Sequence, residues 1–239
     1  MTAAAAEFGI GDARPIPHVV FSDGAIEVLK WFAFIAMIGD HVNVYLFDRE
    51  LPYLFEFGRL AMPIFAIVLG YNLSRPVFHE NNSYWRAMCR LLISGLVSVP
   101  IILMLRHVGW ADILPLNIMF LLLISTMICL LLEGGEWRGT VMAFLLWGST
   151  GVMVEYGWAG IALCVATWLF FRYGNVLALL GALVALGGIC LLNGNMWALT
   201  SIPVIAVASL RNFEFPRIRY VFYWLYPLHL GWLLLLRGM

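Results

Sequence analysis

Asp40 and His41 are adjacent within an otherwise apolar stretch that runs from Trp31 to Phe47. A carboxylate in a hydrocarbon layer costs about 3 kcal/mol or more, so such residues are rare and are usually functional. An aspartate next to a histidine can orient the imidazole and stabilise its charged form, which suits proton transfer. The pair therefore indicates a base inside a membrane, with His41 as the base and Asp40 as the carboxylate that orients it.

Other polar residues in apolar segments are candidates to join this pair. Asn43 is three residues after Asp40 and shares its helix face. Arg59 begins the next apolar segment on the same side, where its charge could hold Asp40 ionised. His229 lies in the last segment, two residues after Pro227. We expect His229 to be a second proton carrier or an oxyanion donor, and a structural hydrogen bond is the alternative.

Two further sets of polar residues lie where apolar segments end. On the side of Arg59, the candidate substrate contacts are Asn43 within the first segment and Asn117, Glu155 and Tyr156 near segment ends. A solvated loop position is the alternative for each of the last three. The candidate contacts for the phosphates of a nucleotide-like donor lie on the opposite side and are Asn72, Arg75, Arg86, Arg90, Arg217 and Arg219. Arginine forks bind phosphate well, although membrane topology and anionic lipid usually explain such clusters.

The composition is that of a membrane protein. The chain has 239 residues, of which 63% are hydrophobic and 12% charged, and its mean hydropathy is +0.91. A soluble domain carries about 25% charged residues. The net charge of zero gives no reason to expect a nucleic-acid partner, and the four widely spaced cysteines match no metal motif, so we expect no metal.

Nine apolar segments predict an all-α, polytopic membrane bundle of about nine transmembrane helices in contact with lipid. The segments are 26–47, 59–74, 87–105, 114–132, 139–154, 158–171, 175–192, 195–210 and 219–236. With a cytoplasmic N-terminus, ten of the fourteen Lys and Arg residues fall on the cytoplasmic side and four on the other. The positive-inside rule favours that orientation. We expect a cytoplasmic tail over 1–25 and one transmembrane domain over 26–239.

Four sequence runs resemble one protein family. They are LKWFAFIAMIGDHVN, FGRLAMPIFAIVLGYNLSR, YGWAGIAL and FYWLYPLHL, in that order along the chain. They resemble the signatures of the TraX family, which has a related plasmid branch called TrbP. The resemblance covers Asp40, His41 and Asn43 in the first run, Gly58, Arg59, Ala61, Pro63, Phe65, Asn72, Leu73, Ser74 and Arg75 in the second, and His229 in the last.

The resemblance implies an acetyltransferase of the bacterial inner membrane. Its members are implied to move acetyl from acetyl-CoA to the N-terminal amine of a processed conjugative pilin. Three alternatives stay open: an acyltransferase acting on a surface sugar, a head-to-tail pilin cyclase and a proton-coupled transporter. The transporter is the least favoured, because the chain shows no convincing inverted repeat, which many such transporters have.

Overall fold

The computed structural model describes residues 20–76, 82–216, 218 and 220–238. Arg217 and Arg219, two of the expected phosphate contacts, lie outside the described residues. Within the described ranges the chain forms helices and no strand, and its one isolated bridge joins Leu116 to Val154. The expectation of an all-α fold is confirmed.

The helices follow the predicted apolar segments closely. In chain order they are α2 (Asp23–Leu46), α3 (Pro52–Gly58), α4 (Ala61–Ser74), α5 (Ser83–Arg106), α6 (Ile118–Glu133), α7 (Trp137–Thr150), α8 (Gly157–Tyr173), α9 (Val176–Asn193), α10 (Ser201–Ser209) and α11 (Val221–Arg237). Short 3-10 turns precede α6 and α10, at Trp110–Asp112 and Trp197–Thr200. Every predicted segment has a helix, whereas the seven-residue α3 was not predicted.

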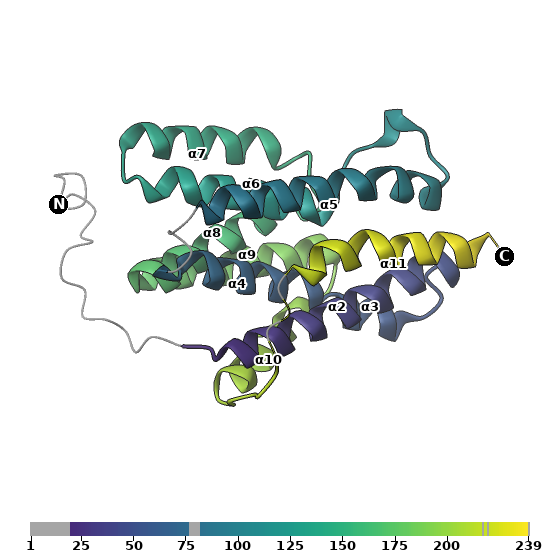
Figure 1. The fold of residues 1–239 in the computed structure, drawn as a ribbon, viewed down its shortest axis with the longest axis horizontal. Coiled ribbons are helices and arrows are strands. Elements are labelled where there is room, and N and C mark those ends of the chain that lie inside the picture. Colours follow the sequence, from purple (N-terminus) through teal and green to yellow (C-terminus); the bar gives the residue numbers. More distant parts are fainter. Residues whose placement is uncertain (1–19, 77–81, 217, 219, 239) are drawn as a thin grey trace.

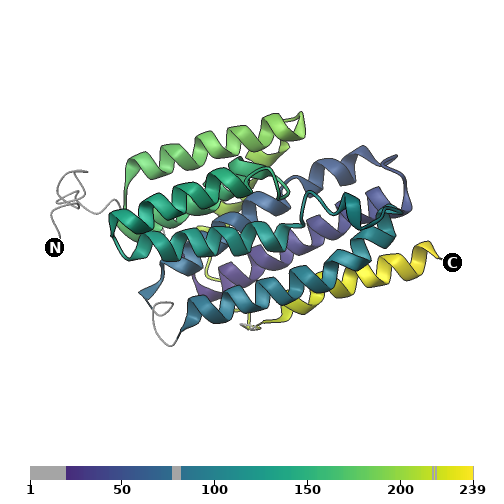
Figure 2. The same ribbon diagram turned by 90° about the horizontal axis from the view of Figure 1, so that it is seen from above.

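The long helices lie side by side with their axes along one direction of the molecule (Figures 1 and 2). Contacts between their ends show that they alternate in direction. Arg75, which follows α4, pairs with Asp23 at the start of α2, and Asn193 at the end of α9 contacts Arg59, which precedes α4. The bundle therefore has two distinct ends.

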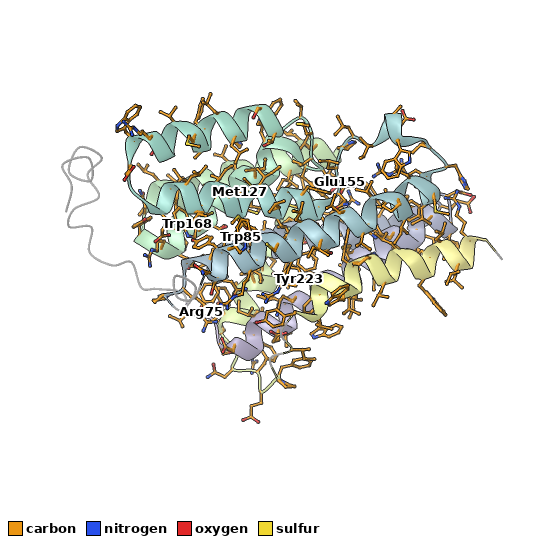
Figure 3. The ribbon with its side chains drawn as sticks, turned by 45° about the horizontal axis from the view of Figure 1, so that its top comes forward. Arg75, Trp85, Met127, Glu155, Trp168 and Tyr223 are labelled. Carbon is orange, nitrogen blue, oxygen red and sulfur yellow. The ribbon has the colours of Figure 1, made fainter. Side chains whose placement is uncertain are left out.

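We name the two ends by the residues that mark them. The histidine end contains His41, Arg59, Arg106, Glu155 and His229. The arginine end contains Asp23, Arg75, Arg90, Glu133 and Arg172. Figure 3 labels Arg75 toward the left end of the bundle, and Glu155 farther toward the opposite end.

Helix α4 lies at the centre of the bundle and packs against α2 and α8. Ile64, Ala66 and Leu73 on this helix have no exposed surface. A Cβ at Gly70 would lie 2.4 Å from the Thr167 hydroxyl oxygen and 2.9 Å from a backbone nitrogen of α8. Only glycine permits this approach, and such small residues let apolar helices pack closely where no hydrophobic force acts between them.

Three stretches are long and apolar enough to cross a membrane: Pro52–Ser74, Ser83–Arg106 and Val176–Asn193. Helix α2 has 24 residues but is not among them, because it carries the charged residues Glu27, Lys30 and Asp40 in addition to His41 and Asn43. One line along α9 is strongly exposed, with Leu177, Val184 and Leu191 at 74%, 76% and 83%. An apolar surface of this kind fits contact with lipid.

The N-terminal boundary differs from the expected tail over 1–25. Residues 1–19 lie outside the described part, but Phe21 is buried and contacts the rings of Tyr71 and Phe171. The Tyr71 hydroxyl accepts a hydrogen bond from the Phe21 N–H and donates one to the Phe21 carbonyl oxygen. Residues from Phe21 onward therefore belong to the bundle.

Candidate active site at the histidine end

His41 and His229 form a hydrogen-bonded pair. The Nδ1 atom of His41 lies 2.8 Å from Nε2 of His229, and the ring planes are 4° apart with centroids separated by 5.1 Å. Parallel planes joined by so short a nitrogen–nitrogen distance place the two rings edge to edge. The pair joins α2 to α11, and its two histidines are 188 residues apart in the sequence.

The Leu225 carbonyl fixes the proton positions in the neutral pair. This oxygen lies 3.0 Å from Nδ1 of His229 and can only accept a hydrogen bond, so Nδ1 of His229 carries the proton. The Nε2 atom of His229 is then an acceptor, and Nδ1 of His41 must donate to it. Nε2 of His41 is left with a lone pair and no proton, which is the form a general base needs.

Asp40 does not orient His41, which corrects the expectation from the sequence. Its Oδ2 atom accepts a hydrogen bond from the Arg59 guanidinium at 2.5 Å. Adjacent helical residues point about 100° apart, so neighbours in sequence face different partners. Arg59 is thus the cation expected beside Asp40. The residue that orients the His41 ring is His229 and not Asp40.

Arg59 is held on several sides. Besides Asp40, it donates to the side-chain oxygen of Asn193 at 3.3 Å and to the carbonyl of Phe55 at 3.2 Å. Its guanidinium carbon lies 4.3 Å from the centroid of the Phe55 ring. Three of its five N–H donors are engaged in these bonds, and two remain.

Gly58 allows α2 to approach Arg59 closely. A Cβ at this position would lie 2.4 Å from the Cβ of Asp40 and 2.9 Å from its carboxyl carbon. Any side chain here would push the aspartate away from Arg59. The Gly-Arg pair of the second sequence run therefore serves one purpose, which is to place a fixed cation against Asp40.

Two expected substrate contacts have structural roles. Asn43 is fully buried, and its side-chain oxygen accepts from the N–H of Leu51 at 2.9 Å, which holds the loop between α2 and α3. Asn117 is 3% exposed, caps α6 through the N–H of Met119 and donates to the carbonyl of Gly95. Side chains so buried do not reach a substrate, so we assign both to the scaffold.

A second ion pair borders the histidines. Arg106, at the end of α5, donates to Glu155 at 3.2 Å, and the two side chains are 30% and 29% exposed. Arg106 also interacts with the hydroxyl of Tyr45 on α2. The Tyr45 ring lies 5.8 Å from the His41 ring, and the Tyr226 ring lies 5.4 Å from that of His229. Arg106, Tyr45 and Tyr226 were not predicted as site residues.

Glu155 lies in the turn between α7 and α8, beside Tyr156. Backbone hydrogen bonds between this turn and Leu116 hold it in place. Burial, together with the charge of Asp40, raises the pKa of Glu155 to about 7 against the opposing effect of Arg106. Tyr156 lies within electrostatic range of Arg59 and Asp40. The structure thus places Glu155, 29% exposed, at the rim of the site, whereas Tyr156 packs against the core beside it.

The expected phosphate contacts form separate interactions at the arginine end. Arg75 pairs with Asp23 at 2.7 Å, and the Arg90 guanidinium lies 3.7 Å from the centroid of the Tyr220 ring. Arg86 is exposed and contacts the hydroxyl of Ser83. Asn72, in the last turn of α4, is partly buried. Arg86 and Arg90 are one helical turn apart on α5 and therefore share a face.

Comparisons with known proteins agree with the sequence motifs. The family model described as "TraX protein" matches residues 25–237. The chain is 29% identical to protein TraX of Escherichia coli over 173 residues, which is 70% of this chain and 66% of that protein. It is 40% identical to protein TraX of E. coli strain K12 over 57 residues, 24% of this chain and 23% of that one.

A third relative is an uncharacterized protein of Rickettsia prowazekii (strain Madrid E), 35% identical over 71 residues, or 30% of this chain and 24% of the relative. The match thus spans just under two thirds of the first E. coli protein and about a quarter of the other two. No solved structure matches. The family match covers nearly all of the described helices, including both histidines and both ion pairs. The chain belongs to the TraX family.

Proposed function

We propose that this protein is a multi-pass acetyltransferase of the bacterial inner membrane that moves acetyl from acetyl-CoA to the N-terminal amine of a processed conjugative pilin. Membership of the TraX family supports the link to conjugation. Antiparallel helices with an apolar outer surface support the nine-span topology. The observation that carries the proposal is the histidine pair, which leaves Nε2 of His41 unprotonated at one end of the bundle.

An acceptor amine needs such a base. The α-amine of a peptide has a pKa of about 7.7–8.0, so at neutral pH most of it is protonated and not nucleophilic. His41 takes a proton from the ammonium group through Nε2. The charged imidazole that results is stabilised by its hydrogen bond to His229, which in turn is anchored on the Leu225 carbonyl.

The reaction then forms one bond and breaks another. The amine nitrogen attacks the thioester carbonyl, the C–N bond forms, and the C–S bond breaks. The leaving sulfur takes one proton, which the protonated His41 can supply. Conversion of an ammonium group to an amide releases two protons, so one proton more must leave the site for each acetyl group transferred.

Arg59 is the candidate for stabilising the negative charge on the thioester oxygen. Its two remaining N–H donors lie on a guanidinium that Asp40, Asn193 and Phe55 already hold in place. A donor that is fixed before the reaction does not have to reorganise during it, and one such donor contributes about 3–4 kcal/mol in acyl-transfer sites.

Acetyl-CoA would approach from the arginine end if that end is cytoplasmic. Arg86 and Arg90 fit its phosphates, since both lie on one face of α5 and no acid is seen to pair with them among the described residues. Arg90 is sixteen residues before Arg106, or about 24 Å of helix rise. The pantetheine arm would extend along this direction, so that its thioester reaches the level of His41.

A reconstituted reaction tests the proposal. The purified protein in lipid vesicles is given acetyl-CoA and a peptide with the N-terminal sequence of the mature pilin, and the peptide is followed by intact mass. We expect one acetyl group per peptide, and none on a peptide whose α-amine is blocked. A loss of the mass of one water would indicate cyclisation instead, and acetylation of added sugars but not of the peptide would indicate the surface-sugar alternative.

A further inference from the structure

The pairing that prepares His41 also closes one exit for its proton. His229 ends the hydrogen-bond chain on the Leu225 carbonyl, which cannot carry a proton onward. The apolar Phe34 ring also contacts His229, with its centroid 5.6 Å from that of the imidazole. The additional proton released in each turnover therefore has to leave from the Nε2 side of His41.

A series of neighbouring polar groups connects His41 with a partly exposed acid. The Tyr45 ring lies beside His41, and its hydroxyl interacts with Arg106. Arg106 holds Glu155, whose side chain is 29% exposed at the rim of the site. Tyr226, beside His229, lies within electrostatic range of Glu155 as well. Polar groups from α2, α5, α11 and the turn before α8 thus lie next to one another between His41 and Glu155.

We propose that Glu155 is the proton exit of the reaction: it receives the proton from His41 by way of the Tyr45 hydroxyl and bridging water, and releases it to the solution. This inference rests on the proposed function. The proton moves as H⁺ along hydrogen bonds, no redox step is involved, and Glu155 returns to its carboxylate form at the end of each cycle.

The two acids of the site differ in their suitability for this task. Asp40 is tied to Arg59 at 2.5 Å, and the Arg59 guanidinium is fixed on further sides. Glu155 is bound more loosely, at 3.2 Å, and is about twice as exposed as Asp40, whose side chain is 16% exposed. An acid that must take up and release protons has to reach water and cannot be locked in one ionised state.

The charges around Glu155 also favour exchange near neutral pH. Burial and the charge of Asp40 raise its pKa, while Arg106 and Arg59 lower it, with a balance at about 7. Tyr45, Tyr156 and Tyr226 are the other titratable groups that face this site. A carboxyl group with such a pKa can accept a proton from an imidazolium and pass it to solution at the pH of the cell.

The test compares Glu155→Gln with Arg106→Gln in the vesicle reaction across a range of pH. We expect the wild-type turnover rate to show an inflection near pH 7. Glu155→Gln should remove the inflection and slow turnover about tenfold at neutral pH. Arg106→Gln should keep the inflection but move it to higher pH, because the carboxylate loses its cation. Asp112→Asn, an exposed acid at the same end, is the control.

A structural role for the ion pair predicts a different result. If the two variants lose activity equally and keep the shape of the wild-type pH profile, the inference is overturned. Infrared titration of the carboxylic acid band keeps the test independent of the acetyl transfer. A band that titrates near pH 7 and vanishes in Glu155→Gln supports the inference, and its absence in the wild type overturns it. If this band is present but no acetylation occurs, the proposed function fails instead.

Discussion

The two ends of the bundle carry similar residues in different arrangements. At the arginine end, ion pairs such as Arg75–Asp23 and Arg172–Glu133 join neighbouring helices. At the histidine end, two ion pairs border a group that can change its protonation, the hydrogen-bonded histidines. The number of charges therefore does not distinguish the site. What distinguishes the site is that two ion pairs lie around one titratable pair of histidines.

Loss of the proposed base, His41, should have the largest effect on activity. His41→Ala removes the Nε2 lone pair, so we expect acetyl transfer to fall about 10²- to 10⁴-fold, the usual contribution of a general base. The matched control is His107→Asn, which alters an exposed histidine at the same end and keeps a residue that tolerates its positive φ of 55°. Full activity in His41→Ala would remove this residue from the mechanism.

Arg59→Gln tests how much the largely buried Arg59–Asp40 ion pair contributes to the free energy of unfolding. The substitution leaves Asp40, 16% exposed, without its cation. Breaking a buried pair costs about 3–5 kcal/mol, and partial exposure places this one at about 3 kcal/mol. Chemical unfolding in detergent micelles measures the difference. Arg59→Lys should recover part of the stability but little of the activity, because an ammonium group cannot contact Asp40, Asn193 and Phe55 together.

Gly58→Ala perturbs the same pair without changing any charge. The new Cβ would overlap Asp40, so we expect a loss of about 1–3 kcal/mol in stability and a larger relative loss in activity. Gly134→Ala is the control, since its φ is −66° and nothing lies within 4 Å of the added atom. Equal behaviour of the two variants in the unfolding and activity assays would show that the close approach at Gly58 is not needed.

The smallest effect is expected at the arginine end. Arg75→Gln breaks a pair whose side chains are 31% and 49% exposed, and such pairs contribute at most about 1 kcal/mol. Measuring the free energies of unfolding of Arg75→Gln and Arg59→Gln side by side compares the two ends directly. A loss at Arg75 as large as that at Arg59 would contradict the distinction drawn between them.

The helices and the two ends could be predicted because they depend on local sequence. Each apolar run is long enough to form a helix, and alternation then assigns its ends. The pairing of Arg59 with Asp40 also follows, since α2 and the start of α4 are close in the chain. Helix α3 was missed because it has only seven residues, PYLFEFG, and no long apolar pattern.

The neighbours of His41 could not be predicted because they depend on which helices pack together. Arg106 comes near Tyr45, and His229 reaches His41, only because α11 packs against both α2 and α5. Sequence adjacency favoured Asp40 as the orienting group, but the helical rotation between neighbouring residues turns it toward Arg59. The burial of Asn43 and Asn117 likewise depends on tertiary contacts.

The protonation state of His41 tests the central claim most directly. Nitrogen NMR on protein with ¹⁵N-labelled histidine distinguishes a protonated ring nitrogen from one with a lone pair, and His41→Ala assigns the signals. We predict an unprotonated Nε2 and a protonated Nδ1 in His41, with a hydrogen bond from this Nδ1 to Nε2 of His229. A proton on Nε2 of neutral His41, with Nδ1 as the acceptor, would contradict the account.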